Sequence, residues 1–198
     1  MLHSDRTIIL SGAAGPEWKT LYETTPCLPV RGEGRRHGIP FVGYLGGGRM
    51  ALLDEQTLLL AVGDFGFDGV ASVEAQAQNS ATSYGKTIAI NIADGRAALF
   101  PLGHRNPQGL FVDRSGTIWS TEHGPQGGDE LNRLERDKNY GWPYATDGTD
   151  YGSFSWPLNK PDTQQATRRR YLPGSLRLRL QICWLSRVGY FHMGAAIC

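Results

Sequence analysis

The run GHRNPQG at residues 103–109 is the stretch of sequence from which the fold can be worked out. A second polar run, EHGPQGGDE, follows at residues 122–130, and a third, NYGWP, at residues 139–143. Between the first two runs lie two apolar segments separated by the turn sequence DRSG, which is the pattern of a β-hairpin. Both polar runs should therefore extend from the same end of one hairpin, where loops on a β scaffold form a site.

The first run combines a permanent cation with neutral polar groups. Arg105 supplies the cation and His104 an imidazole, while Asn106 and Gln108 supply amides. Arginine and amides together suit a planar ligand that is rich in carbonyl or carboxylate oxygens.

The second run places Gly-Pro and Gly-Gly pairs beside Asp129 and Glu130. The glycines allow backbone carbonyls to turn inward, and with the carboxylates they suit a hard cation such as calcium. The same residues are also typical of structural turns, so their spacing leaves both interpretations open.

The three runs, in this order, resemble the soluble aldose and glucose dehydrogenases that depend on pyrroloquinoline quinone (PQQ), also called the glucose/sorbosone dehydrogenase family. The resemblance covers about residues 47–160. It implies an all-β fold, a six-bladed β-propeller whose cofactor lies over the top loops. At about 40 to 50 residues per four-stranded blade, a chain of 198 residues holds two or three blades, so we expect a partial propeller.

The resemblance also implies roles for individual residues at a PQQ site. Arg105 is the expected catalytic residue, because it would stabilise charge on the quinone oxygen. Asn106 and Gln108 are expected to contact the cofactor. Gly124 and Pro125 are expected to give carbonyl oxygens to the cofactor's calcium.

A second, structural calcium position is implied by Glu130 and the carbonyl of Tyr140, with Asp129 as a neighbour. The implied reaction is the oxidation of an aldose at its anomeric hydroxyl to a lactone. A histidine base would remove the hydroxyl proton while hydride passes to the quinone. The implied partners are a small sugar substrate and an electron acceptor.

The position of the general base departs from the family pattern. GRM at residues 48–50 matches the family's catalytic strand, in which a histidine stands four residues before the arginine, but that position here is Leu45. Leucine cannot accept a proton, and His37 is too distant in sequence to be assumed as a substitute. Neither His104 nor His123 is assigned as the base. The alternative is therefore a non-catalytic β-propeller binding module, and enzymatic activity stays open.

Alternating segments and turn residues predict further strands. The predicted strands lie at residues 6–12, 18–24, 49–53, 57–62, 85–92 and 96–102, although 18–24 could also be one helical turn. The sequence GDFG at residues 63–66 matches the family's Gly-Asp-x-Gly turn. We expect a blade turn there rather than a calcium loop, since EF-hand spacing is absent. Residues 70–84 are predicted to form a long loop.

The composition separates a main part from a tail. Residues 1–162 carry 14 Lys/Arg and 19 Asp/Glu, whereas residues 163–198 carry six Arg and no acid, which together give the net charge of +1. Codons allowed from about Arg169 permit, in a shifted frame, PVFAWVPSIAVSNLLAV, which resembles the family's Trp-x-Pro-Ser-Ile-Ala segment. We therefore expect a partial propeller over residues 1–166 and a frame-shifted tail over 167–198.

The remaining features define what the chain is expected to bind and where. Binding of nucleic acid through the tail arginines is the weaker interpretation, so no nucleic-acid partner is expected. No apolar run approaches the length of about 20 residues that a membrane span needs. Family members are usually periplasmic or secreted, and the start of this chain is not a secretory signal, so we expect a missing N-terminus and an incomplete or inactive fragment. The three cysteines predict unpaired, buried thiols.

Overall fold

A computed structural model describes residues 6–11, 17–28 and 44–148, and the structural statements that follow refer to these residues. The expectations for His37, for the segment 149–166 and for the tail 167–198 lie outside them.

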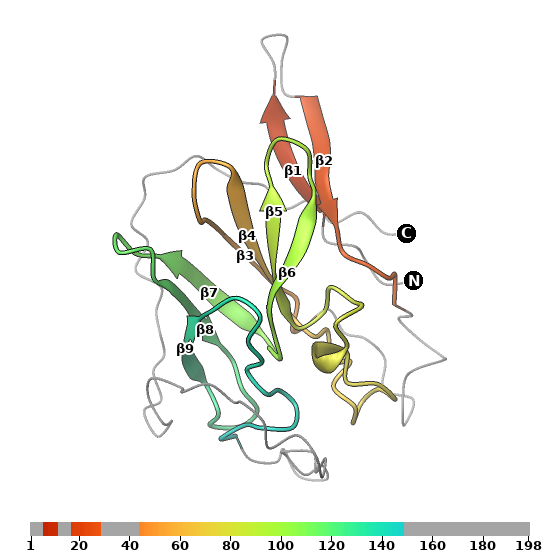
Figure 1. Cartoon of the computed structure of the whole chain (residues 1–198). Helices are drawn as coiled ribbons and strands as arrows, with labels where there is room; N and C mark the ends of the chain where they lie inside the picture. The colour runs from red at the N-terminus through yellow and green to blue at the C-terminus, as the bar shows by residue number, and fades with distance from the viewer. Residues whose placement is uncertain (1–5, 12–16, 29–43, 149–198) are drawn as a thin grey trace.

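Three antiparallel sheets follow one another along the described chain (Figure 1). β1 (Arg6–Ser11) and β2 (Glu17–Glu23) form a hairpin. A four-stranded sheet contains β3 (Gly47–Leu52), β4 (Thr57–Val62), β5 (Lys86–Asn91) and β6 (Ala97–Leu102) in sequential order. A three-stranded sheet contains β7 (Pro107–Val112), β8 (Ile118–Glu122) and β9 (Glu130–Leu134). The predicted all-β fold is confirmed, and the four-stranded antiparallel sheet with sequential strand order has the form expected of one propeller blade.

The long connection between β4 and β5 is a loop, as predicted, and contains the short 3-10 helix η1 (Gln76–Gln78). The second strand of the first hairpin is confirmed as a strand and not a helical turn. β9 was not predicted, because its sequence had been interpreted as the end of a cation-binding loop. Its inward-facing residues include Glu130 and Asn132, so its apolar alternation is interrupted by polar residues.

β4 holds the sheets together because it is buried on both faces. Its residues Leu58, Leu60 and Val62 belong to one apolar cluster, which includes Ile88 and Ile90 of β5 and reaches Leu21 and Tyr22 of β2. The alternate residues of β4 belong to a second cluster, which joins the four-stranded sheet to the three-stranded one. The members of the second cluster are Leu59, Ala61, Ala89, Phe100, Leu110, Ile118, Leu134 and Tyr140. A continuous run of apolar residues is the expected sequence of a strand covered on both faces.

The hairpin of β7 and β8 is closed by the predicted turn at residues 113–116. The Asp113 carboxylate accepts hydrogen bonds from the backbone N–H groups of Ser115 and Thr117 and from the indole N–H of Trp119. The Ser115 hydroxyl also donates to this carboxylate, over 2.6 Å. These hydrogen bonds, with that of the Ser115 hydroxyl contributing most, lower the pKa of Asp113 to about 2. Gly116 has a φ of 80°, which a residue with a side chain adopts only at a cost.

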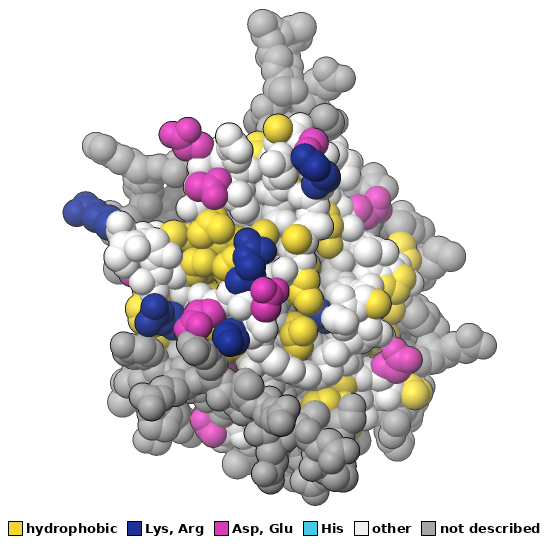
Figure 2. Space-filling model, in the orientation of Figure 1, with side chains coloured by type: hydrophobic (Ala, Val, Ile, Leu, Met, Phe, Trp, Pro, Cys, Tyr) yellow, Lys and Arg dark blue, Asp and Glu magenta, His cyan; other side chains and the backbone are white. Residues whose placement is uncertain are grey.

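The surface of the described residues is mixed in character. Figure 2 shows basic and acidic side chains interspersed with apolar ones on the face in view. Cys27 is exposed, so the prediction of a buried thiol is wrong at this position. The described part of the chain has no helix with the length and apolarity that crossing a bilayer requires.

Gly85 and Gly116 test how tightly the loops are packed on the strands. Gly85 has a φ of 69°, and a methyl group there would lie 2.5 Å from the Ala77 Cβ and 2.6 Å from the His104 carbonyl oxygen. Gly116 has a similar φ, but a methyl group there would meet no atom within 4 Å. We expect Gly85→Ala to lower the free energy of unfolding by about 2–4 kcal/mol and Gly116→Ala by only about 1 kcal/mol. Urea denaturation followed by circular dichroism measures both, and equal losses would contradict the packing argument.

Candidate functional site

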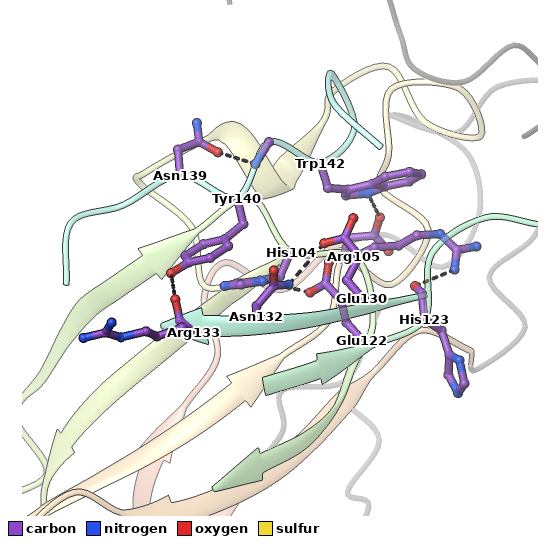
Figure 3. Close-up of polar contacts among 12 residues, drawn as sticks. His104, Arg105, Glu122, His123, Glu130, Asn132, Arg133, Asn139, Tyr140 and Trp142 are labelled. Carbon is purple, nitrogen blue, oxygen red and sulfur yellow. Dashed lines mark hydrogen bonds and ion pairs between the residues drawn. The ribbon is translucent and has the colours of Figure 1, made fainter. Parts of the chain in front are cut away.

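The three polar runs meet at one end of the three-stranded sheet. Pro107 at the start of β7 pairs with Glu122 at the end of β8, and the His123 N–H donates to the Asn106 carbonyl over 3.0 Å. The third run joins them because the N–H of Trp142 donates to the Gly103 carbonyl over 3.0 Å. The prediction that both polar runs extend from the same end of one hairpin is confirmed (Figure 3).

Arg105 lies at the centre of this loop cluster. Its guanidinium Nη1 donates hydrogen bonds to the carbonyl oxygens of His123 and Gly124, at 3.0 and 2.7 Å. Its Cζ lies 5.3 Å from the ring centroid of Trp142, which is a cation–π arrangement. Nη1 thus faces the loop carbonyls, and the guanidinium carries further N–H groups that a ligand can use.

The two amides of the first run lie together. Gln108 Nε2 donates to Asn106 Oδ1 over 2.7 Å, and the Asn106 side chain is buried. The Gln108 carbonyl accepts from Nε of Arg49, which belongs to the predicted catalytic strand in the neighbouring sheet, over 3.1 Å. The fold therefore brings the GRM strand and the first polar run to the same place.

The turn at residues 124–128 is closely packed at its two end glycines, Gly124 and Gly128. A Cβ on Gly124 would meet the carbonyl group of Gly128. The Pro125 carbonyl accepts from the Gly128 N–H over 2.9 Å, and the Gly124 carbonyl accepts from Arg105. Each carbonyl oxygen has two lone pairs, so both oxygens retain one for a cation. The oxygen chemistry of this turn fits calcium.

A second group of polar residues is buried where the sheets meet. His104 is 0% exposed, its Nδ1 lies 2.8 Å from a carboxylate oxygen of Glu122, and its ring stacks on Tyr140 at a centroid distance of 4.9 Å. Because a carboxylate only accepts hydrogen bonds, Nδ1 carries the proton. His104 is thus shielded from solvent and held by Glu122 and Tyr140.

Glu122 and Glu130 face each other across β8 and β9, and both are buried. Asn132 Nδ2 donates to Glu130 over 3.1 Å, and within the described chain Asn132 Oδ1 is buried without a hydrogen-bond partner. Two buried carboxylates and an amide oxygen are hard oxygen donors of the kind that calcium prefers. No group of three or more His, Cys, Asp or Glu side chains is arranged as metal ligands among the described residues, so calcium here would need carbonyl oxygens as well.

Asp64, which the sequence predicts only as part of a blade turn, also belongs to this region. Its carboxylate is 0% exposed and accepts from the indole N–H of Trp142 over 2.6 Å. Burial raises the pKa of Asp64 to about 7; the nearby Asp68 carboxylate adds to the rise, and the Arg105 guanidinium opposes it. The Gly-Asp-x-Gly match gave the only signal for this residue, because its partner is 78 positions away in sequence.

Lys86, the first residue of β5, is a second buried ionisable group. Its Nζ donates to the carbonyls of Gln76 and Tyr84, at 2.7 and 2.5 Å. Burial lowers its pKa to about 7, and the negative charge of Asp64 opposes this fall. These two hydrogen bonds therefore hold the loop around η1 against β5.

Leu45, at the expected base position, has a φ of 65°. Its carbonyl accepts from the N–H of Phe65 over 3.1 Å, so the backbone at position 45 is held against the Gly-Asp-x-Gly turn. Its aliphatic side chain offers no proton acceptor, and His104 is buried against Glu122, away from solvent.

Successive antiparallel sheets with their strands in sequential order, and polar loops gathered at one end, agree with part of a β-propeller, and the structure is similar to those of sugar dehydrogenases with this fold. The glucose/sorbosone dehydrogenase family profile matches residues 42–171, so the chain belongs to that family.

Characterised relatives are similar over part of their lengths. The chain is 42% identical to the aldose sugar dehydrogenase YliI of Escherichia coli over 81 residues, which cover 40% of this chain and 22% of the relative. It is 31% identical to quinoprotein glucose dehydrogenase B of Acinetobacter calcoaceticus over 143 residues, which cover 57% of this chain and 30% of the relative. The apo-form crystal structure of the E. coli soluble aldose sugar dehydrogenase superposes with a TM-score of 0.60 at 27% identity, covering 80% of this chain and 44% of that one.

The two motif histidines offer a matched test of the buried contact. His104→Ala removes the partner of a buried carboxylate, so we expect the free energy of unfolding to fall by about 3–5 kcal/mol. His123→Ala changes an exposed side chain and should stay within about 0.5 kcal/mol of the unsubstituted chain. Urea denaturation of both variants measures the difference, and a small effect of His104→Ala would show that the Glu122 contact contributes little.

Proposed function

We propose that this chain forms the part of a PQQ-dependent sugar dehydrogenase that binds the quinone and its calcium ion. The observation that carries the proposal is the Arg105 cluster, in which the guanidinium and two paired amides of the first run lie beside the His123 and Gly124 carbonyls of the second run, which accept hydrogen bonds from the guanidinium. Membership of the family and the similarity to a quinoprotein glucose dehydrogenase support it.

The chain's residues suit an anionic, planar quinone. The guanidinium of Arg105 would provide fixed positive charge for the quinone oxygens, and Asn106 and Gln108 would provide amide groups that hold the cofactor. The carbonyls of Gly124 and Pro125 would hold calcium, and Glu130 with the Tyr140 carbonyl would hold a second, structural calcium. When bound, PQQ supplies the hydride acceptor and calcium polarises its carbonyl.

The proposed substrate class is an aldose sugar, oxidised at the anomeric hydroxyl to a lactone, with a separate electron acceptor. Removal of the hydroxyl proton needs a base near the quinone, and Leu45 cannot provide one. This observation favours a second candidate function, a propeller module that binds the cofactor but does not turn over sugar.

Titration of the pure chain with PQQ and calcium tests the binding proposal. We expect a saturable absorbance change at micromolar PQQ, which is lost when calcium is removed with a chelator. Arg105→Met should weaken PQQ binding by about 10- to 100-fold, because one charge-assisted contact is lost. Arg114→Met, on the exposed β7–β8 turn, is the matched control and should leave the affinity within about twofold. The absence of a saturable change for the unsubstituted chain would refute the proposal.

Restoring a histidine at position 45 separates the two candidate functions. The change equivalent to Leu45→His, made in an intact relative that carries leucine there, should create sugar-dependent reduction of a dye where none existed before. The backbone at this position accepts the change, since histidine is among the residues that tolerate a positive φ. Sugar oxidation with leucine in place would show that the base lies elsewhere, and an inactive histidine variant would show that position 45 is not the base position.

A further inference from the structure

The Arg105 guanidinium lies beside Trp142, which is itself bonded to Asp64, and these two buried residues come from distant segments of the chain. Its Cζ lies 5.3 Å from the ring centroid of Trp142, whose side chain is only 3% exposed. The Trp142 indole in turn donates its N–H to Asp64 Oδ2 over 2.6 Å. Asp64 also reaches Arg105 directly, because the Asp64 N–H donates to the Arg105 carbonyl over 2.8 Å.

Trp142 is fixed at its backbone as well as at its ring. Its N–H donates to the Gly103 carbonyl over 3.0 Å, and its own carbonyl accepts from Gln78 Nε2 over 2.6 Å. The hydrogen bond from the indole N–H to Asp64 further restricts rotation of the ring away from the guanidinium.

Asp64 is held equally firmly. Its Oδ1 accepts from the Gly66 N–H over 2.8 Å, which leaves Oδ2 to the indole. The carboxylate is therefore aimed at Trp142 by the Gly-Asp-x-Gly turn that contains it.

We propose that Asp64 and Trp142 act together as positioning residues for Arg105, with the carboxylate fixing the indole and the indole fixing the guanidinium against the carbonyls of His123 and Gly124. An arginine side chain that is ordered in advance loses less conformational entropy when it binds an anion. The pair should thus strengthen cofactor binding without touching the cofactor. This consequence rests on the proposed PQQ site, whereas the positioning itself does not.

The ionisation of Asp64 offers a way to observe its hydrogen bond with the Trp142 indole. The charged groups around its carboxylate are Asp68 in the same turn, Lys86 from β5 and Arg105 from the loop before β7. Burial and Asp68 raise the pKa of Asp64 to about 7, against Arg105 and the two N–H donors. An ionised carboxylate is the stronger acceptor for an indole N–H, so this hydrogen bond should strengthen as the pH rises through about 7.

The first experiment follows indole N–H resonances of the full 198-residue chain by 1H–15N NMR between pH 5 and 9. Trp142→Phe identifies the Trp142 resonance, which should shift with a midpoint near pH 7 and become insensitive to pH in Asp64→Asn. Trp119 is an internal control, because its indole donates over 3.0 Å to Asp113, whose pKa is lowered to about 2, and its resonance should stay constant. A Trp142 resonance that does not respond to Asp64→Asn would overturn the pairing.

The second experiment measures the guanidinium itself, without cofactor. Hydrogen exchange of the Arg105 side-chain N–H groups, assigned with Arg105→Met, should be about tenfold faster in Trp142→Leu and unchanged in Trp119→Leu. Equal exchange rates in the two leucine variants would overturn the positioning role whether or not the chain binds PQQ.

The third experiment measures PQQ affinity. Trp142→Leu and Asp64→Ala should each weaken binding by about tenfold, and the double variant should be no weaker than Trp142→Leu, because the two residues act as one unit. Asp64→Asn, whose amide oxygen still accepts from the indole, should recover affinity to within about threefold. Asp113→Ala is the matched control. If Asp64→Ala does not fold, the affinities of Asp64→Asn and Trp142→Leu still test the proposal, and an unchanged affinity in Trp142→Leu contradicts it.

If the unsubstituted chain binds no PQQ, the proposed function is refuted. The two NMR measurements then still test, without cofactor, whether Asp64 and Trp142 position Arg105.

Discussion

Because β4 carries an apolar or small side chain at every position after Thr57, neither of its faces can be left in water, and the sheets on both sides of it are placed by this constraint. One face of β4 packs against the segment around β2 and Leu28, and the other packs against the β7–β9 sheet. Once these faces are covered, the loops that leave β4, β6 and β8 end in the same region. The polar site is therefore a consequence of apolar packing beneath it, which fixes the strands from which its loops extend.

Several polar groups that enter this region pay a desolvation penalty, and hydrogen-bond partners from other segments of the chain offset part of it. His104 is paired with Glu122, Asp64 with Trp142, and Lys86 with the carbonyls of Gln76 and Tyr84. An unpaired buried group of this kind would cost several kcal/mol, so these bonds also restrict where the loops can go. Rigidity at the site follows from burial, and a rigid loop is what a pre-organised binding site requires.

Local signals in the sequence were sufficient for much of the fold. Turn residues between alternating segments located the hairpins, and the position of the GHRNPQG and EHGPQGGDE runs at one end of the β7–β8 hairpin followed from hairpin geometry alone. β9 could not be predicted because Glu130 and Asn132 are buried, so its sequence is polar at positions where the buried face of a strand is usually apolar. The contact between Asp64 and Trp142 could not be found by any local pattern, because the two residues lie in loops that follow different sheets and are 78 positions apart in the sequence.

The arrangement of the site separates two tasks that catalysis would combine. Holding an anionic cofactor needs fixed positive charge and ordered carbonyls, and Arg105 with the turn at Gly124 supplies both. Removing a substrate proton needs a basic side chain with solvent or substrate access, and neither Leu45 nor the buried His104 meets this requirement. In the proposed arrangement the side-chain supports of Arg105 come from Asp64 and Trp142, while position 45 is bonded to the Gly-Asp-x-Gly turn through its backbone carbonyl, so the arrangement requires no particular side chain at the base position. A substitution there can thus remove proton transfer while the geometry around the guanidinium is kept.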